Sequence, residues 1–293
     1  MGHTGSKDYN LRFLSDADFA ALYGAFVGAF SDYAVDLQMS EDQLQQMFVR
    51  NGVRYDLSAG AFDADRLIGF TVNGLDSWMG KTTVYDAGTG VIPEYRGRGI
   101  AKNLFSFIFP RLRENGVEQY LLEVIDSNEP ALNLYRQLGF QTQRKLAVLS
   151  SIAPLEGRRG AVPDEALIVG IDTPDWELFR SFWDWSPSWQ NSVAAIERSI
   201  SRKVILGACI GGACVGYGIV YVSSGSIAQL AVAKDQRRKG IGTLLLHHLR
   251  RAVDSGKPLR VINVDTSSEA TMTFYAVSGF STLVRQDEMI KGL

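Results

Sequence analysis

Two arginines and two glycines alternate from Arg96 to Gly99, directly before a stretch with the apolar spacing of a helix. The start of a helix leaves about four backbone N–H groups without acceptors and carries roughly half a positive charge. Glycine lets these donors approach a bulky anion without a Cβ atom in the way, and a guanidinium matches the geometry of phosphate oxygens. Apolar residues then recur at four-residue spacing from Ile100 to Leu112. The stretch therefore predicts an anion site that suits a diphosphate.

The glycine–arginine stretch is written twice along the chain. VIPEYRGRGIAKNLF (91–105) aligns with VAKDQRRKGIGTLLL (232–246), 141 residues further on. NEPALNLYRQLGF (128–140) aligns with SEATMTFYAVSGF (268–280), and the spacing between the two blocks is kept. A repeat of this length indicates a duplicated domain, not a solenoid. Neither copy has the Gly-Lys-Ser/Thr of a Walker loop or the G-x-G-x-x-G of a dinucleotide fingerprint.

Both halves resemble the GNAT superfamily of acyl-CoA-dependent N-acetyltransferases. The resemblance rests on R-x-x-G-x-G/A at a strand-to-helix turn, and on a tyrosine in N-x-x-A-x-x-x-Y-x-x-x-G-F about 39 residues later. It covers nearly the whole chain, as in a tandem, two-domain member. It implies an α/β fold of two tandem GNAT-like domains, each a mixed, mostly antiparallel twisted sheet flanked by helices. It also implies acetyl-CoA as the co-substrate, with no metal.

The resemblance further implies which residues bind the coenzyme. In the family, backbone amides of the first motif hold the diphosphate, and the pantetheine arm lies along the strand before it. Asn128 matches the asparagine that hydrogen-bonds this arm, whereas Ser268 in the second half is too short for the same reach. The implied coenzyme-binding residues are Val91, Ile92, Arg96, Gly97, Arg98, Gly99, Ile100, Ala101, Asn128, Val232, Ala233, Arg237, Arg238, Lys239, Gly240, Ile241 and Gly242.

Tyr135 and Tyr275 match the family tyrosine that protonates the departing thiolate, which a hydroxyl with a pKa near 10 can do. The base that deprotonates the acceptor amine is expected to be Asp86 or Glu123, or a water relay. Both carboxylates stand in otherwise apolar strands, where a charge is costly unless it is paired or used.

The second half lacks carboxylates at these positions, because Ile227 and Asn263 replace Asp86 and Glu123. We therefore expect the first half to be the catalyst. The second half is expected to be degenerate, with a structural or coenzyme-binding role.

Aromatic residues before each hairpin are the candidates for the acceptor side. The first half offers Phe30 and Tyr33, and the second half offers Trp183, Trp185 and Trp189. Three tryptophans within seven residues, broken by serines and a proline, suit a loop wall for an acceptor. They suit an inter-domain contact equally well.

Each half is predicted to contain two helices, a hairpin, a strand, the glycine–arginine turn, a helix, a strand, a helix and a closing strand. The early helices are expected at 16–30, 39–52, 176–183 and 192–201, and the hairpin turns at 63–65 and 211–212. The domains are expected at 1–150 and 164–293, with a linker of small, Gly, Pro and charged residues at 151–163.

Composition excludes several classes of protein. A net charge of −2 over 293 residues, with Lys and Arg scattered, gives no general attraction to nucleic acid. No run of 18 apolar residues predicts a membrane span, and the polar N-terminus lacks the apolar core of a signal peptide. Two cysteines do not make a disulfide framework, and three histidines argue against zinc chemistry. A cytoplasmic protein is expected, and its oligomeric state, homodimer included, stays open.

The sequence thus predicts a tandem N-acetyltransferase that acetylates a primary amine of a small molecule, such as an aminoglycoside, a polyamine or an amino-acid-like acceptor. Two alternatives remain open: acetylation of protein N-termini or lysines, and a non-catalytic acyl-CoA sensor.

Overall fold

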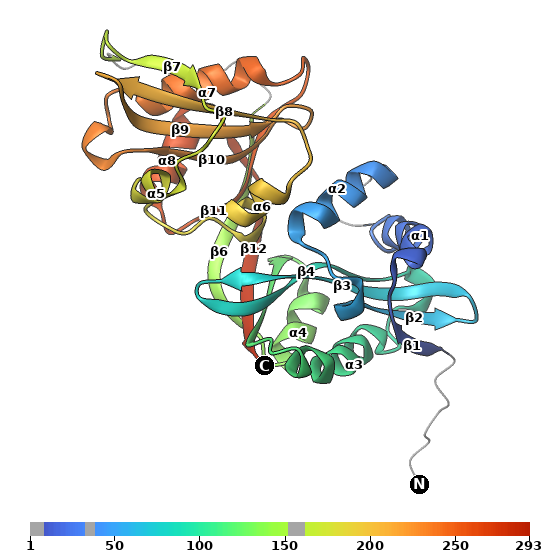
Figure 1. Cartoon of the computed structure of the whole chain (residues 1–293). Helices are drawn as coiled ribbons and strands as arrows, with labels where there is room; N and C mark the ends of the chain where they lie inside the picture. The colour runs from blue at the N-terminus through green and yellow to red at the C-terminus, as the bar shows by residue number, and fades with distance from the viewer. Residues whose placement is uncertain (1–8, 33–38, 152–161) are drawn as a thin grey trace. The chain divides into compact units, whose positions relative to one another are not determined.

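The computed structural model describes residues 9–32, 39–151 and 162–293. Its contacts divide the chain into two compact units (Figure 1). Unit 1 consists of Met1–Gln143 and Glu288–Leu293, and unit 2 of Arg144–Asp287. Of the linker expected at 151–163, residues 152–161 lie outside the described residues.

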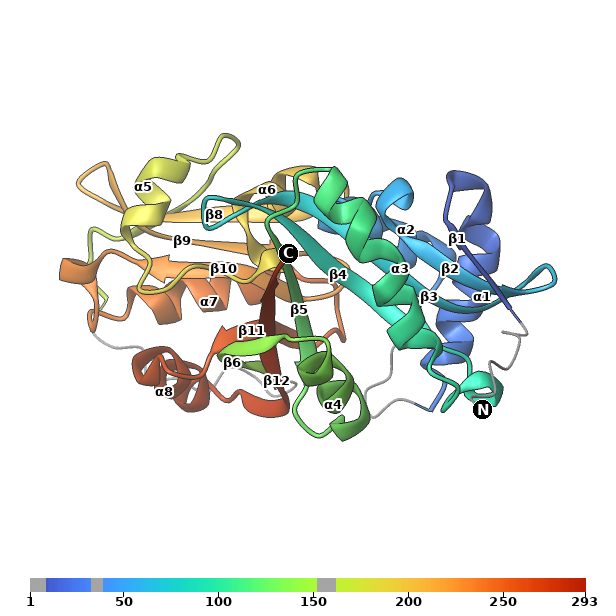
Figure 2. The ribbon, with the colours of Figure 1, turned by 90° about the horizontal axis from the view of Figure 1, so that it is seen from below.

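Unit 1 is a six-stranded open sheet with helices on both faces. In spatial order its strands are β1 (Asn10–Phe13), β2 (Ala59–Asp63), β3 (Arg66–Trp78), β4 (Lys81–Val91), β5 (Gln119–Ile125) and the end of β12 (Ser281–Gly292). The first four strands are antiparallel, and β5 runs parallel to β4. One face is covered by α1 (Phe19–Ala29) and α2 (Glu41–Asn51), the other by α3 (Ile100–Glu114) and α4 (Glu129–Gln137). Figure 2 shows α3 running along β3 and β4.

Local signals set the helix bounds in unit 1. The Ser40 side chain accepts from the Gln43 N–H and caps α2, and Gly52, at φ 69°, ends that helix in the left-handed conformation. The 16–30 segment forms a short 3-10 turn, η1 (Asp16–Asp18), followed by α1. Both helices expected here are therefore confirmed.

An aromatic cluster fills the core of unit 1 between the sheet and α3. The Phe105 ring lies 5.6 Å from the Tyr120 ring, 5.8 Å from the Tyr135 ring and 6.1 Å from the Phe140 ring, measured between centroids. Edge-to-face packing of this kind is favourable for aromatic rings. It fixes α3 and α4 against β5, the parallel neighbour of the strand that enters the predicted anion site.

Unit 2 repeats the layout. Its strands, in spatial order, are β6 (Gln141–Ser151), β11 (Leu259–Asp265), β10 (Ser226–Val232), β9 (Ala213–Tyr221), β8 (Lys203–Ile210) and β7 (Leu167–Gly170). Its helices are α5 (Trp176–Ser181), α6 (Val193–Arg198), α7 (Ile241–Ala252) and α8 (Glu269–Val277). The hairpin turn between β8 and β9 has Gly211 and Gly212 at φ 57° and 82°, as the sequence predicted.

The closing strand of each unit comes from the other half of the sequence. β6 follows α4 in the chain, yet it pairs antiparallel with β11 inside unit 2. The end of β12 joins the sheet order beside β5, where the Leu293 N–H donates to the Glu118 carbonyl at 3.0 Å. The sequence predicted that each half would close with its own last strand. The two strands are instead exchanged.

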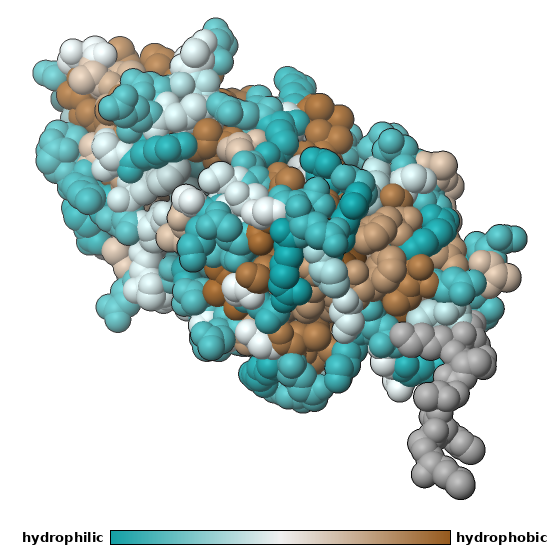
Figure 3. Space-filling view, turned by 60° about the horizontal axis from the view of Figure 1, so that its bottom comes forward, coloured by the Kyte–Doolittle hydropathy of each residue, from teal (hydrophilic) through white to brown (hydrophobic). Residues whose placement is uncertain are grey.

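The expected fold class, α/β with two mixed, mostly antiparallel sheets flanked by helices, is confirmed. Within the described ranges, no helix is both long and apolar enough to span a bilayer. In the same ranges, no three His, Cys, Asp or Glu side chains gather as a metal site would require. On the face in Figure 3, hydrophobic residues lie in small groups among hydrophilic ones.

Candidate active site

In each unit the strand that enters the glycine–arginine turn separates from its parallel neighbour. β4 pairs with β5 only from Thr83 to Tyr85, and a bulge between β3 and β4 follows at Ala87. In unit 2, β10 pairs with β11 only at Ser226 and Ile227, and the bulge recurs at Ala228. Each unit therefore presents a strand edge whose backbone groups can pair with an extended ligand.

The turn that follows has the same backbone conformation in both units. Gly97 and Gly99 have φ of 75° and 74°, and Arg238 and Gly240 have φ of 63° and 74°. Left-handed backbone costs a non-glycine residue roughly 1–2 kcal/mol. Unit 2 keeps this conformation even though an arginine occupies the first position.

The helices that leave these turns begin without side-chain caps. Their N-cap residues, Gly99 and Gly240, form no side-chain cap hydrogen bond, as is also true of the N-cap residues of α1 and α8. In contrast, Ser40, Asn128, Asp175 and Ser192 cap α2, α4, α5 and α6. A Cβ placed at Gly97 or Gly99 would meet no atom within 4 Å. Free amide donors facing open space fit a diphosphate. We call these turns, residues 96–101 and 237–242, the cradles.

The basic side chains of the cradles differ in direction. Arg98 donates to the Glu94 carbonyl at 3.0 Å and lies over the Tyr95 ring, and Lys239 donates to the Gln236 side chain at 2.9 Å. The Arg98 and Lys239 side chains remain exposed at the rim of their cradles, whereas Tyr95 is half-buried. Arg96 and Arg237 point away, toward the segments that follow α1 and α5.

Asp86 and Tyr135 are brought together beside the open edge of β4. The Asp86 carboxylate accepts from the Gly88 N–H at 2.9 Å, from the Thr89 hydroxyl at 2.8 Å and from the Tyr135 hydroxyl. Burial of the carboxylate raises the pKa of Asp86 to about 6, and these three hydrogen bonds oppose the shift. The residue as a whole is half-buried, because its strand lies at the open edge. A carboxylate with a pKa near neutral can exchange a proton under physiological conditions.

A buried polar chain continues from Asp86 into the sheet. The Thr89 hydroxyl lies 3.0 Å from Thr71 Oγ1, which lies 3.3 Å from the Tyr120 hydroxyl, and Tyr120 donates to Asn73 Oδ1. Burial raises the pKa of Tyr120. These groups were not predicted from the sequence. Thr71, Asn73 and Thr89 carry no signal beyond being polar residues within apolar strands.

Glu123 lies on the other face of the sheet from Asp86. Its carboxylate accepts from the Tyr85 hydroxyl at 2.5 Å. Tyr85 and Asp86 are consecutive on β4, and consecutive strand residues point to opposite faces. Asp86 contacts Tyr135 on the α3/α4 face, so the Tyr85–Glu123 pair lies on the α1/α2 face. The two candidate bases, Asp86 and Glu123, therefore lie on opposite faces of the sheet at the open edge of β4.

Tyr275 occupies the matching place in unit 2 but has other neighbours. It is buried among Phe274 and Phe280, with ring centroids 5.2 and 5.1 Å away, and burial raises its pKa. Ile227 stands where Asp86 does. Asn263, buried at φ 59° within a bulge of β11, stands where Glu123 does. No carboxylate corresponding to Asp86 or Glu123 lies beside Tyr275.

Unit 2 nevertheless contains a formed groove of about 440 Å³ along β10, β11 and α8. Its inner end is lined by a hydrogen-bonded chain. Trp183 Nε1 donates to the Tyr217 hydroxyl at 2.6 Å, which donates to Gln229 Oε1 at 2.7 Å, and Gln229 Nε2 donates to the Asn191 carbonyl at 2.6 Å. Tyr217 and Gln229 were not predicted from the sequence, since each lies within an apolar strand. The groove also borders Arg237, Gly240 and Gly242 of the cradle.

The remaining predicted residues are distributed as follows. Asn128 Oδ1 accepts from the Ala131 N–H at 3.2 Å and caps α4, whereas the Ser268 hydroxyl bonds Thr271. Val91, Ile92, Val232 and Ala233 lie at the ends of β4 and β10, and Ile100, Ala101, Ile241 and Gly242 open α3 and α7.

The five aromatic candidates do not share one location. Trp183 and Trp185 line the groove of unit 2. Phe30 packs against Phe26 at 4.7 Å in unit 1. Trp189 is only 1% exposed and belongs to the core of unit 2, because η4 (Trp189–Asn191) turns its ring inward. Tyr33 lies outside the described residues.

Comparison with known proteins gives two family matches. Residues 19–140 match the model described as the acetyltransferase (GNAT) family, and residues 185–292 match the acetyltransferase (GNAT) domain. A stretch of 116 residues is 30% identical to N-alpha-acetyltransferase 30 of Schizosaccharomyces pombe, covering 37% of this chain and 77% of that protein.

Two further matches extend the comparison. A stretch of 100 residues is 32% identical to the streptothricin acetyltransferase of Streptomyces lavendulae, covering 34% of this chain and 47% of that protein, less than half of its length. The solved structure of a tandem GNAT protein from the clavulanic acid biosynthesis pathway aligns with 97% of this chain and 98% of its own, with a TM-score of 0.74 and 16% identity. At this level of identity, the similarity to the tandem GNAT protein shows a shared fold and nothing more.

Proposed function

The chain belongs to the GNAT family of acetyltransferases and is an acyltransferase, and on this premise we propose that unit 1 transfers an acetyl group from acetyl-CoA to a primary amine of a small molecule. The observation that carries the proposal is the Asp86–Tyr135 hydrogen bond beside the open edge of β4. When bound, acetyl-CoA supplies a thioester carbonyl for the amine to attack and a thiolate as the leaving group.

The backbone of unit 1 would hold the coenzyme at two places. The amides of the cradle, from Gly97 to Ala101, would bind the diphosphate, with Arg98 adding positive charge. The unpaired edge of β4 after Tyr85 would pair with the pantetheine arm, in the way that an extended peptide adds to a sheet edge.

Glu123 is the base in this proposal. An alkyl amine with a pKa near 10.4 is neutral in only about one molecule in 2,500 at pH 7, so a group that removes its proton raises the rate. Glu123 and its donor Tyr85 lie on the face covered by α1 and α2, whose connection is the expected acceptor side. Asp86, in contrast, already accepts three hydrogen bonds on the other face.

Tyr135 is the acid, and Asp86 holds it in place. The Tyr135 ring is 7% exposed and fixed by Phe105 and Phe140, so its hydroxyl has little freedom besides rotation of the O–H bond. Rotation of that bond away from Asp86 would direct the proton to the leaving sulfur. The Asp86 carboxylate, whose pKa is about 6, can then take up a proton from solvent and pass it to the Tyr135 oxygen.

Tyr135→Phe should lower kcat by a factor of about 100, as expected for loss of a general acid, and leave the Kd of acetyl-CoA within twofold. Tyr275→Phe in unit 2 is the matched control and should leave kcat unchanged. Thiol release measured with a chromogenic disulfide, and calorimetry with coenzyme A, give the two quantities. If Tyr275→Phe is the damaging change instead, unit 2 is the catalyst.

The type of acceptor distinguishes the proposed acetylation of a small molecule from the acetylation of protein N-termini. The 30% identity to an N-alpha-acetyltransferase favours a peptide N-terminus, whereas the 32% identity to a streptothricin acetyltransferase favours a small amine. Assays should compare an aminoglycoside, a polyamine, a lysine analogue and peptides with free N-termini. Turnover confined to the peptides would favour the alternative, and coenzyme binding without any turnover would favour a sensor.

We assign unit 2 a coenzyme-binding role without catalysis. Its cradle has the same backbone as that of unit 1, and its groove is formed. It lacks both carboxylates of unit 1.

A further inference from the structure

Arg96 connects three segments of unit 1. Its Nε donates to the carbonyl of Val91, the last residue of β4, at 3.1 Å. Its Nη2 donates to the carbonyl of Ala29, the last residue of α1, at 2.9 Å. Its guanidinium also forms a bidentate ion pair with Asp32, with N–O distances of 2.6 and 2.8 Å.

Arg237 repeats these contacts in unit 2. Its Nε donates to the carbonyl of Val232, the last residue of β10, at 3.0 Å. Its Nη2 donates to the Phe182 carbonyl, just after α5, at 2.9 Å, and Nη1 lies 3.0 and 2.8 Å from the two oxygens of Asp184. Both arginines thus donate to a carbonyl at the end of a strand, a carbonyl at or just after the end of a helix, and an aspartate. The two aspartates, Asp32 and Asp184, nevertheless lie in segments that do not resemble each other in sequence.

The geometry leaves these arginines few donors for phosphate. A guanidinium has five N–H groups, and the contacts of Arg96 use four of them. The helix-end carbonyl is an acceptor that a helix cannot satisfy itself, and a cation is favourable at that end. Arg96 and Arg237 are therefore built into their own units.

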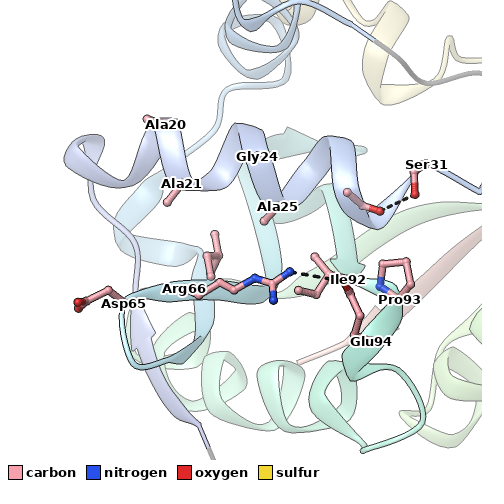
Figure 4. Close-up of a pocket in the computed structure, with 12 residues that line it drawn as sticks. Ala20, Ala21, Gly24, Ala25, Ser31, Asp65, Arg66, Ile92, Pro93 and Glu94 are labelled. Carbon is pink, nitrogen blue, oxygen red and sulfur yellow. Dashed lines mark hydrogen bonds and ion pairs between the residues drawn. The ribbon is translucent and has the colours of Figure 1, made fainter.

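The C-terminal part of α1 packs on the sheet through Phe26 and Phe30, whose rings contact that of Phe70, but the side of the helix that faces the start of the cradle is less well packed. Figure 4 shows this region, where a cavity of about 430 Å³ lies between α1 and residues 92–94. The side of α1 that borders it carries only small residues, namely Ala20, Ala21, Gly24, Ala25 and Gly28. Few apolar contacts can form on this side of α1, so the hydrogen bond from Arg96 to the Ala29 carbonyl adds a direct link between the end of the helix and the cradle.

We propose that Arg96 is a positioning residue that clamps the segment after α1 to the strand leading into the cradle, so that the acceptor side and the coenzyme side are assembled together. Arg237 does the same in unit 2. The kinetic effects expected of the clamp rest on the proposed function, whereas the structural effects do not. It changes the role of Arg96 from the phosphate ligand implied by the family resemblance to a link between two sites.

Three variants test the clamp: Arg96→Gln, Asp32→Asn and the double variant. Each single change should raise the KM for the acceptor or lower kcat, with kcat/KM for the acceptor down about tenfold, and leave the Kd of coenzyme A within twofold. The double variant should lose little more than either single one, because both remove the same contact. Arg96→Lys should restore only part of the kcat/KM lost in Arg96→Gln, since an ammonium cannot reach three acceptors at once.

Arg54→Gln is the matched control. Arg54 forms an equally exposed bidentate pair with Asp56 in the same unit, at 2.8 and 2.7 Å, away from the cradle. Its loss should leave both kinetic constants and coenzyme affinity unchanged.

Hydrogen exchange gives a readout that needs no ligand. Arg96→Gln should speed exchange both at the end of α1 and in residues 92–99. If coenzyme affinity instead falls tenfold in Arg96→Gln but not in Asp32→Asn, Arg96 is a phosphate ligand and the clamp is wrong. If the native protein acetylates no amine, the proposed function fails, and unchanged exchange in both segments would still overturn the clamp.

Discussion

Burial strongly affects the ionisation of the Asp86 carboxylate in unit 1. Its pKa is about 6 in the folded chain and about 3.9 in an unfolded one. The folded state therefore holds the proton more tightly, and ionisation of Asp86 opposes folding. The contribution to stability is complete below about pH 4 and is lost as the pH rises through 6. Asp18 behaves oppositely: Arg12 lowers its pKa to about 2, so its contribution is lost as the pH falls from about 4 toward 2.

Asp86→Asn should remove the pH dependence between 4 and 6. At pH 7 the variant should be more stable than the native protein, by at most about 3 kcal/mol, because the cost of burying the charge is gone. Activity should fall, since an amide cannot return a proton to Tyr135. Thermal unfolding at pH 4, 5, 6 and 7 measures the effect, with Asp65→Asn in the exposed β2–β3 turn as the control for loss of a charge. A variant that is less stable than the native protein at pH 7 would contradict the assignment of burial as the dominant cause.

At the scale of elements, the cradle depends on a backbone conformation that only glycine adopts without strain. Gly99→Ala should cost about 1 kcal/mol of stability, from the positive φ of 74°. It should also raise the Kd of coenzyme A at least tenfold, because the added Cβ projects into the open space facing the amides of α3.

Gly116→Ala is the matched control for the cradle. Gly116 has φ of 72°, also faces open space, and lies beyond the other end of α3. It should lose the same stability and keep full coenzyme affinity. Differential scanning fluorimetry and calorimetry separate the two effects. Equal loss of affinity in both variants would mean that the cradle amides do not touch the ligand.

Elements whose signals are local could be predicted from the sequence. The Ser40 cap bonds a backbone group three residues away, and Gly211–Gly212 forms its turn with adjacent residues, so each needed no distant partner. The tyrosine and the cradle were located by motif. The direction of the Arg96 side chain was not predictable, since its partner Asp32 lies 64 positions away and nothing in the motif specifies it. The Asp86–Tyr135 contact likewise depends on how β4 and α4 pack.

At the scale of the whole molecule, the exchange of closing strands makes each unit depend on the other half of the sequence. Both β6 and β12 carry similar patterns of buried and exposed residues, so periodicity alone cannot assign either to a sheet. Contacts between residues that lie far apart in the sequence determine which sheet each strand joins. Lys145 on β6 forms an ion pair with Asp287 at 2.7 Å within unit 2, whereas Met289, two residues further along β12, is buried in the core of unit 1.

Met289→Ala should therefore destabilise unit 1, although the residue lies only four positions from the C-terminal end of the chain. Met289 is 1% exposed and packs in the same apolar core as Phe105 and Tyr120, so its truncation should cost about 3 kcal/mol. Hydrogen exchange should accelerate first in β4 and β5, and binding of coenzyme A in unit 1 should weaken as those strands open. Met79→Ala is the control, because that side chain is 76% exposed and its loss removes little buried surface. Faster exchange confined to β9 and β10 would mean that β12 closes the sheet of its own half, and that the exchange of strands does not occur.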